Sequence, residues 1–440
     1  MTGTGASRSS AGWLCALLAT LLGVTTPRVH AAEFVAGPDR YRDVVPKLRP
    51  GDTLVLEPGV YTRGLDVHGV SGTPAAPIAI VGAPGTARSV FVARPGRNTI
   101  SIANSAYVRI ADLDVEGHGA SVDAVKAEGT ARFAHHIVVE GLRISGYAAS
   151  QQNVGISTKC PAWGWTIRGN RIADVGTGLY LGNSDGSAPF VRGVIERNVV
   201  TGTRGYSMQV KHQNAWPDEI PDMSPDGQTI IRYNTFAKNG NSSTGEFARP
   251  NLLLGHWPLA GRGSSDRYLV YGNLFLDNPV EALFQAEGNV TLYNNVFVNR
   301  FGDAVAIREH NDVPRNIEVL RNTIVARDTG LLLRHAAVSA RQTIAGNAIF
   351  AKDVVPAELA QANAVYRYDE AASYLRIVPS LGTAMDLAPR EGALVDRQWR
   401  ISGFESLPDI HLDFDGKPRT TATFGAYAAG APAATGRFQP

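Results

Sequence analysis

The sequence repeats one short pattern along most of its length. A hydrophobic segment of alternating Val, Ile, Leu and Phe runs into a turn that carries Asn or Leu, and neighbouring turn positions lie between 22 and 39 residues apart. A period that drifts in this way is typical of stacked β-coils with loops of unequal length, rather than of helix pairs or propeller blades. We therefore predict an all-β, right-handed parallel β-helix. The turn residues are Leu113, Leu142, Asn170, Asn198, Asn234, Asn273, Asn295, Asn322 and Asn347.

Asparagine suits the turn of such a coil for two reasons. It tolerates the left-handed backbone region, and its amide can bond to the asparagine of the coils above and below. The two longest intervals, 198–234 and 234–273, hold insertions that are rich in polar and aromatic residues. Because insertions in a solenoid decorate one face, we expect the functional residues on that face.

The first residues have the composition of a signal peptide. Arg8 precedes the apolar run WLCALLATLLGV, and the segment ends in a small-residue cleavage site at residues 29–31. The apolar run is too short for a membrane span. We predict cleavage after residue 31 and a periplasmic or secreted protein. Cys160 is then the one remaining cysteine, so the mature chain cannot form an internal disulfide.

The mature chain is expected to form a single domain over residues 32–427, because a solenoid grows in one dimension and needs no domain boundary. Residues 39–48 are expected to form a short helix that caps the first coil. The tail, residues 428–440, is rich in Ala and Gly and is predicted to be disordered. The net charge is only +2 and no later apolar run could cross a bilayer, so we expect no nucleic-acid partner and no membrane insertion. The oligomeric state stays open.

Aligning the strands that precede the turns gives two columns of chemical interest. The outward-facing column carries basic side chains at Lys159, Lys211, Arg308 and Arg334. The next column is expected to bring titratable groups of adjacent coils into one row, at His212, His256, Glu287 and Glu309. A ladder of hydrogen bonds at the turns is the alternative role for this row.

Lys211 is the best-placed catalytic candidate, because it lies on an otherwise apolar strand directly before a long insertion. Arg232 follows 21 residues later in the segment IIRYNTF. Over residues 205–236, the pattern of VKH, insertion and IIRYNTF resembles polysaccharide lyase family six, which includes chondroitinase B and alginate lyases. The phrases GDTLVLEPGVY and DFDGKPRTTATFGAY resemble the first and last segments of pectate-lyase-like β-helix proteins. The resemblance implies β-elimination from a uronic-acid polymer, with Lys211 as base and Arg232 as acid.

The sequence departs from that family at its calcium site. Where the family commonly has two glutamates shortly before the lysine, this chain has Arg204 and Tyr206. Calcium is possible for the family, but its ligands are missing here, so we expect no cofactor. A cation must still neutralise the substrate carboxylate, and Arg204, Arg249 or Arg308 could replace the metal.

The proposed chemistry needs a neutral Lys211, and both burial and the nearby Arg232 are expected to lower its pKa. Because a guanidinium hardly ever loses its proton, His212 or Tyr233 is an alternative acid. Trp216 and Trp257 are expected to form flat platforms for sugar rings, or to clamp the insertions onto the solenoid. The candidate substrate-binding residues are Trp216, Arg249, His256, Trp257, Glu287, Arg308, Glu309 and His310.

Other functions stay open beside the leading prediction of a polysaccharide lyase. A C5-epimerase begins with the same proton abstraction, but the Asp-Pro-His-Asp segment of alginate epimerases is not found in this sequence. A glycoside hydrolase would need paired carboxylates, for which Glu287 and Glu309 are the candidates. A non-catalytic carbohydrate-binding or export protein of an exopolysaccharide pathway would use the same surface for recognition alone. The fold cannot choose among these functions.

Overall fold

The structure is a computed structural model of the 440-residue chain. It describes residues 1–3, 31–240, 242–377, 385–396, 403–420 and 422–428. Residues 4–30 of the predicted signal peptide and residues 429–440 of the predicted tail therefore lie outside the described residues. Within the described part of the chain, no helix is both long enough and apolar enough to cross a membrane.

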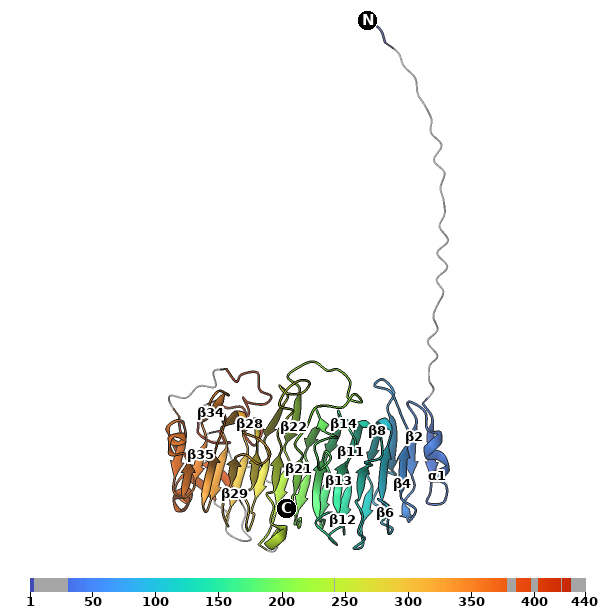
Figure 1. Cartoon of the computed structure of the whole chain (residues 1–440), viewed down its shortest axis with the longest axis horizontal. Coiled ribbons are helices and arrows are strands. Elements are labelled where there is room, and N and C mark those ends of the chain that lie inside the picture. The colour runs from blue at the N-terminus through green and yellow to red at the C-terminus, as the bar shows by residue number, and fades with distance from the viewer. Residues whose placement is uncertain (4–30, 241, 378–384, 397–402, 421, 429–440) are drawn as a thin grey trace. The chain divides into compact units, whose positions relative to one another are not determined.

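Three parallel sheets, here named A, B and C, run along the stacked coils, and each coil adds one strand to each sheet in that order (Figure 1). Sheet A contains β1 (Glu33–Ala36), β2 (Thr53–Leu56), β5 (Ile78–Gly82), β8 (Ser105–Ala111), β11 (Ala134–Glu140), β15 (Thr166–Arg168), β19 (Val194–Glu196), β22 (Gln228–Arg232), β25 (Arg267–Tyr271), β28 (Gly288–Tyr293), β31 (Arg315–Leu320) and β34 (Gln342–Ala345), with β14 (Ala162–Trp163) and β18 (Phe190–Val191) attached to it.

The other two sheets have the same parallel order. Sheet B contains β3 (Gly59–Tyr61), β6 (Ser89–Val92), β9 (Asp114–Glu116), β12 (Arg143–Ser145), β16 (Arg171–Ala173), β20 (Val199–Thr201), β23 (Thr235–Ala237), β26 (Leu274–Leu276), β29 (Val296–Asn299), β32 (Thr323–Ala326), β35 (Ala348–Phe350) and β37 (Ala364–Tyr366). Sheet C contains β4 (Leu65–His68), β7 (Ile100–Ala103), β10 (Val125–Ala127), β13 (Val154–Thr158), β17 (Thr177–Leu181), β21 (Met208–Val210), β24 (Leu252–Leu254), β27 (Phe284–Ala286), β30 (Val305–Ile307), β33 (Thr329–Leu333) and β36 (Asp353–Val355).

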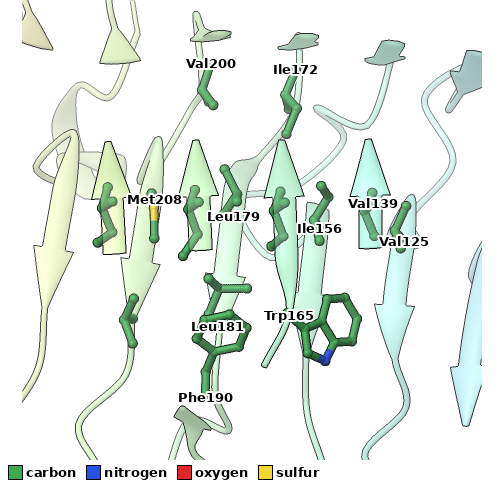
Figure 2. Packing of buried hydrophobic residues seen from close by; sticks show 14 of the residues in the cluster. Val125, Val139, Ile156, Trp165, Ile172, Leu179, Leu181, Phe190, Val200 and Met208 are labelled. Carbon is green, nitrogen blue, oxygen red and sulfur yellow. The ribbon is translucent and has the colours of Figure 1, made fainter. Parts of the chain in front are cut away.

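The alternating pattern of the sequence produces the core. In sheet C the inward residues Val125, Ile156, Leu179 and Met208 pair in register from coil to coil, and none of them is exposed (Figure 2). Every second side chain of a strand points to the opposite face. On each of these strands, the residue next to the inward one therefore faces away from the core. This alternation places the candidate site on the outside of sheet C.

A ladder of buried asparagines follows sheet A at the turn into sheet B. In a typical rung, Asn234 donates from Nδ2 to Oδ1 of Asn273 at 3.0 Å, and its own Oδ1 accepts both the backbone N–H and the amide Nδ2 of Asn198 at 3.0 and 2.9 Å. The predicted bonding between coils is confirmed. The ladder runs through Asn170, Asn198, Asn234, Asn273, Asn295, Asn322, Asn347 and Asn363.

The left-handed backbone at this turn lies one residue earlier than we predicted. Tyr233 has φ of 57° and Gly272 has φ of 63°, each directly before the ladder asparagine of its coil. The asparagine is therefore needed for its hydrogen bonds and not for its backbone freedom. Leu142 occupies the same turn position in a coil nearer the N-terminus, where its N–H donates to Oδ1 of Asn170 at 3.0 Å.

Short elements close the two ends of the stack. The predicted cap helix is present as α1 (Tyr41–Val44) followed by the 3-10 turn η1 (Val45–Lys47). Tyr41 is buried and packs edge-on against Tyr61. Towards the C-terminal end, the chain forms η3 (Ala357–Ala362), η4 (Tyr368–Glu370), α2 (Ala371–Tyr374), β38 (Leu375–Ile377) and β39 (Asp386–Pro389). The remaining element, η2 (Gly245–Phe247), lies in the second long insertion.

The closing segment packs back onto the β-helix. The guanidinium of Arg419 donates to Oδ1 of Asn294 at 2.9 Å and to the carbonyl oxygen of Ala426 at 2.7 Å. The N–H of Ala428 donates to Oδ2 of Asp413 at 3.2 Å. Ordered contacts therefore reach at least the last described residue.

Candidate functional site

A polar cavity of about 600 Å³ lies over the outward face of sheet C. On β10, β13, β17 and β21 the outward residues Lys126, Ser157, Tyr180 and Gln209 pair in register, one per coil. Neighbouring strands lie about 4.8 Å apart, so this row spans roughly 14 Å. The cavity is lined by Gly96, Asn98, Ser121, Val122, Asp123, Lys126, Gln151, Gln152, Asn153, Val154, Lys159, Thr177, Tyr180, Ser184, Tyr206, Gln209, Lys211, Arg249 and His310.

The charges that line the cavity are mostly positive. Lys126, Lys159, Lys211 and Arg249 contribute cations, and among the described lining residues Asp123 is the one carboxylate. Asp123 is buried and already bonded, because it accepts the N–H of Val154 and the hydroxyl of Ser157, each at 2.9 Å, and its Oδ2 lies 3.4 Å from Nζ of Lys126. The cavity is therefore suited to an anionic ligand.

Lys159 lies against the ring of Tyr180. Its Nζ is 3.4 Å from the ring centroid, which is a close cation–π contact. The pKa of Lys159 is lowered to about 8, mainly by burial; Asp123 opposes this shift, and the positive charges of Lys126 and Lys211 contribute to it. Near neutral pH the ammonium form still predominates, but it has little solvent around it and can bind an anion strongly.

Lys211 occupies the next outward position after β21. It is half-buried, and burial lowers its pKa, whereas the carboxylate of Glu287 acts in the opposite direction. Glycines flank it on both neighbouring coils: a Cβ on Gly182 would come within 3.3 Å of the Lys211 Cβ, and a Cβ on Gly255 would come within 2.9 Å of its carbonyl carbon. The absence of side chains at these two positions allows the neighbouring coils to pack closely against Lys211.

Two tyrosines complete the centre of the cavity. Burial raises the pKa of Tyr180, whose hydroxyl lies 3.1 Å from the hydroxyl of Ser184, and burial also raises the pKa of Tyr206. Both phenols therefore keep their protons at neutral pH and are potential proton donors. Tyr180 is flanked by Lys159 on one side and by the strand that carries Lys211 on the other.

Arg249, one of the predicted substrate-binding residues, lies in the second long insertion and lines the cavity. Its guanidinium carbon lies 5.9 Å from the ring centroid of Tyr206. Its Nη1 donates to the carbonyl oxygens of Glu246 and Ala248 at 3.1 and 2.6 Å. These bonds keep the guanidinium folded against its own loop, while the residue forms part of the cavity lining.

The structure does not bring Arg232 to Lys211. Arg232 is at the end of β22 in sheet A, where its Nε donates to Oε2 of Glu196 at 2.8 Å and its Nη1 donates to the hydroxyl of Tyr271 at 2.9 Å. Strands β21 and β22 belong to different sheets of the solenoid, so a separation of 21 residues places the two side chains on different faces. The predicted Lys211–Arg232 pair is wrong as a geometric pair.

The two alternative acids also lie elsewhere. Tyr233 donates its hydroxyl to Oδ2 of Asp409 at 2.5 Å, and burial together with this carboxylate raises its pKa. His212 does not line the cavity, and its ring centroid lies 5.4 Å from that of His256. Burial and the charge of Lys211 lower the pKa of His212, so this imidazole is neutral at pH 7.

The predicted row of histidines and glutamates contains a register error. Leu252 pairs with Phe284, so Glu287 belongs to the column of Lys211 and not to that of His212. Glu287 is buried and accepts the backbone N–H groups of His256 and His310, both at 3.0 Å. It is a structural carboxylate that fixes two turns.

The other predicted binding residues divide between the cavity and the surface. His310 lines the cavity. Arg308 and Glu309 are exposed, do not line the cavity, and Glu309 pairs with His335 at 2.7 Å. The predicted carboxylate pair of Glu287 and Glu309 is therefore not presented to this cavity. His256 also lies outside it, with Nδ1 2.7 Å from the carbonyl oxygen of Trp257.

Both tryptophans are clamps and not sugar platforms. Trp216 is 7% exposed and donates from Nε1 to Oε1 of Gln213 at 2.8 Å. Trp257 is 2% exposed, and its ring centroid lies 4.5 Å from that of Tyr268. Because the faces of both rings are covered, the prediction of a stacking platform is wrong and the alternative role as clamps holds.

The residues at the expected calcium position do not fit that ion. Calcium prefers carboxylate and carbonyl oxygens, but Arg204 stands there and donates to the carbonyl oxygen of Ala148 at 2.9 Å. Tyr206, the second residue of the pair, lines the cavity with a protonated phenol. In the described residues no group of three or more His, Cys, Asp or Glu side chains is placed to hold a metal ion. We derive no step through calcium.

Sequence reasoning missed several residues of the cavity, notably Lys126, Tyr180, Tyr206 and Asp123. Tyr180 could have been found, because it is the outward residue of LYLGN in the alignment that identified Lys211. Tyr206 comes from the turn before β21 and has no periodic signal. Lys159 was placed outward by the alignment, but its contact with Tyr180 depends on the fold.

Comparison with known families agrees with the sheet topology. Residues 154–353 match the family described as right handed beta helix region. The fold is a right-handed parallel β-helix. This confirms the predicted fold. Comparison with curated proteins finds no match.

Several solved structures are similar to this chain at low sequence identity. An alginate lyase from Paenibacillus sp. str. FPU-7 has 15% sequence identity and a TM-score of 0.51, and the alignment covers 76% of this chain and 98% of that chain. The pectate lyase Pel9A has 13% identity and a TM-score of 0.47, with 91% and 97% covered. The A-module of the mannuronan C-5 epimerase AlgE4 from Azotobacter vinelandii has 13% identity and a TM-score of 0.39, with 69% and 87% covered. At these identities the likeness concerns the fold alone.

Proposed function

We propose that this protein is a polysaccharide lyase that cleaves a uronate-containing polysaccharide by β-elimination. The observation that carries the proposal is the arrangement of Lys159, Tyr180 and Lys211 on three successive coils of one cationic cavity. This set offers a base, a proton donor and a cation for the carboxylate. The similar Paenibacillus protein is an alginate lyase, so a β-helix of this kind can carry such an activity.

Lys211 is the base of the proposed reaction. In its neutral form, the amine removes the proton from C5 of the uronate, and its lowered pKa increases the fraction of neutral amine near pH 7. The electron pair of the broken C5–H bond forms the C4–C5 double bond, and the C4–O bond to the leaving sugar breaks. The leaving oxygen takes a proton from the Tyr180 hydroxyl. Water then restores both groups to their starting protonation states.

The carboxylate of the substrate must be neutralised for C5 to lose its proton. Lys159 and Arg249 supply positive charge on two sides of the cavity, and charge-assisted hydrogen bonds to a carboxylate are about twice as strong as neutral ones. They are aimed at the charge that develops on the carboxylate as an enolate forms, which is where electrostatic stabilisation is most effective. These two residues take the role that calcium has in polysaccharide lyase family six.

The cavity favours elimination over glycoside hydrolysis. A hydrolase needs two carboxyl groups beside the scissile bond, whereas Asp123 is the one carboxylate among the described lining residues and is fully bonded. C5-epimerisation shares the first step and differs only in the fate of the carbanion. We further propose that the protein acts in the periplasm or outside the cell, on the basis of the signal-peptide composition of residues 1–31.

The proposal is tested by incubating purified protein with alginate, pectate, chondroitin, hyaluronan and bacterial exopolysaccharides, with and without EDTA. The expected result is ultraviolet absorbance from unsaturated uronate with one of them, unaffected by the chelator. Tyr180→Phe and Lys211→Met should each lower the rate of this absorbance change by at least about 10²-fold. Lys352→Met, at an exposed lysine outside the cavity, is the matched control. Inverted C5 centres without chain cleavage would show an epimerase, and polymer binding without either product would show a binding protein.

A further inference from the structure

Lys238 is a buried lysine that the proposed reaction does not use. It follows β23 and is 5% exposed, although lysine is rarely buried without a partner. It does not line the cavity, yet it lies beneath residues 242–250, the loop that carries Arg249. The hydrogen-bond partners of this buried ammonium group therefore indicate its role.

The ammonium group of Lys238 makes three hydrogen bonds, all within this loop. Nζ donates to the hydroxyl of Ser243 at 2.9 Å, to the carbonyl oxygen of Arg249 at 2.7 Å and to that of Pro250 at 3.3 Å. An ammonium has three N–H donors and no acceptor, so three oxygen acceptors satisfy it completely. Burial lowers the pKa of Lys238 well below its usual value, and the Glu281 carboxylate opposes this shift while Arg249 adds to it.

The same network holds both backbone polar groups of Arg249. Its N–H donates to the hydroxyl of Ser243 at 2.9 Å, and its carbonyl oxygen accepts from Lys238 and, at 2.8 Å, from Nδ2 of Asn278. Asn278 also donates from Nδ2 to Oδ1 of Asn251 at 2.9 Å, which joins the network to the residue just before β24. The backbone from which the Arg249 side chain starts is therefore fixed to the core of the solenoid.

The loop is also joined to a second residue of the cavity lining. Nε2 of Gln151 donates to the carbonyl oxygen of Phe247 at 3.3 Å, and both Gln151 and Arg249 line the cavity. This bond joins the loop to a segment about a hundred residues earlier in the chain. Loss of the hydrogen bonds from Lys238 would free this loop and move the Arg249 guanidinium away from the lysines of the cavity.

We propose that Lys238 is a positioning residue, which holds Arg249 at the place where the guanidinium binds the carboxylate of an acidic polysaccharide. This inference rests on the proposed function for the role of Arg249, and on geometry alone for the link between Lys238 and the loop. Lys238 acts through Arg249 and does not touch the substrate.

The test is a double-mutant cycle of Lys238→Met and Arg249→Ala, measured on the polymer that the wild-type protein cleaves. Lys238→Met keeps the aliphatic chain and removes the ammonium. We expect it to raise KM about tenfold, the size of one displaced charge-assisted contact, with kcat within about twofold. In the Arg249→Ala background the same change should have no further effect on KM, because residues that act as one unit are not additive.

Ser243→Ala gives a second variant that alters no buried charge and should shift KM in the same direction. The matched control, Lys352→Met, removes an exposed lysine and should leave KM unchanged. An effect of Lys238→Met that persists in full in the Arg249→Ala background, or that falls mainly on kcat, would overturn the proposal.

Hydrogen exchange of residues 242–250 without ligand separates this inference from the proposed function. Faster exchange there in Lys238→Met, with unchanged exchange in sheets A and B, supports the link to the loop. Unchanged exchange in the loop refutes the link even if the protein is a lyase. If the loop exchanges faster but the wild-type protein neither cleaves nor binds any acidic polymer, the proposed function fails and Lys238 remains a structural staple.

Discussion

Replacing Asn234 by leucine tests how far the asparagine ladder stabilises the fold. The side chain is fully buried in the middle of the ladder. Its loss removes the acceptor of the Asn198 backbone N–H, and takes one bond each from the Asn198 amide, the carbonyl oxygens of Ile195 and Arg232, and Oδ1 of Asn273. One orphaned buried donor costs about 1–3 kcal/mol and each of the four weakened partners about 1 kcal/mol, so the free energy of unfolding should fall by about 5–7 kcal/mol.

The assay is guanidinium chloride unfolding followed by circular dichroism, with the free energy of unfolding extrapolated to water. Asn214→Leu is the matched control, because Asn214 is exposed and its side chain makes one bond, at 2.8 Å, to the carbonyl oxygen of Asp185. That variant should lose less than about 1 kcal/mol. A loss below about 1 kcal/mol for Asn234→Leu would refute the reasoning. It would mean that an apolar side chain fills this turn as well in the middle of the stack as Leu142 does near its N-terminal end.

The remaining predictions concern the cavity. Tyr180→Phe should lower kcat by about 10²–10⁴-fold with little change in binding, as expected for loss of a general acid, and a normal kcat would remove Tyr180 from the mechanism. The pH profile of kcat/KM should be bell-shaped, because Lys211 must be neutral, which favours high pH, while Lys159 must be charged, which favours low pH. The limb on the high-pH side should lie near the Lys159 pKa of about 8 and should disappear in Lys159→Met. Arg232→Ala should keep kcat within about twofold but lower the free energy of unfolding by about 1–2 kcal/mol, because the buried Glu196 carboxylate loses its closer arginine partner and keeps only Arg197, at 3.4 Å. A large fall in kcat would restore Arg232 to the reaction.

The repeating turn made the architecture predictable from the sequence. Buried strands alternate with a period of two, and the turn asparagines recur because each must bond to its neighbours in the stack. The same alternation placed Lys211 outward, since a lysine on an apolar strand has to leave the core. These are local constraints, and each coil repeats them.

The parts of the site that the sequence did not reveal depend on the relation between coils. Arg232 was paired with Lys211 from a resemblance in sequence, but the path of the chain from sheet C to sheet A separates them. Glu287 was shifted by one column because LFQAE aligns equally well in two registers, and only strand pairing decides that Phe284 faces Leu252. A shift of one residue reverses the face of every side chain in a strand.

The contact between Lys159 and Tyr180 arises because two strands that lie 23 residues apart in sequence become neighbours in the sheet. Trp216 and Trp257 have the composition of sugar platforms, yet the insertions fold over them and cover their faces. This burial depends on tertiary packing, so it cannot be predicted from the presence of an aromatic residue in a polar loop.

The most direct test of the central claim is the rate of unsaturated uronate formation by wild-type protein and Lys211→Met under single-turnover conditions, with the acidic polymer bound in both. The account predicts rapid formation of the unsaturated product by the wild-type protein, and a rate at least about 10³-fold lower in the variant at unchanged affinity. Equal rates in the two proteins, or a cleaved product that carries no double bond, would contradict the assignment of Lys211 as the base of an elimination.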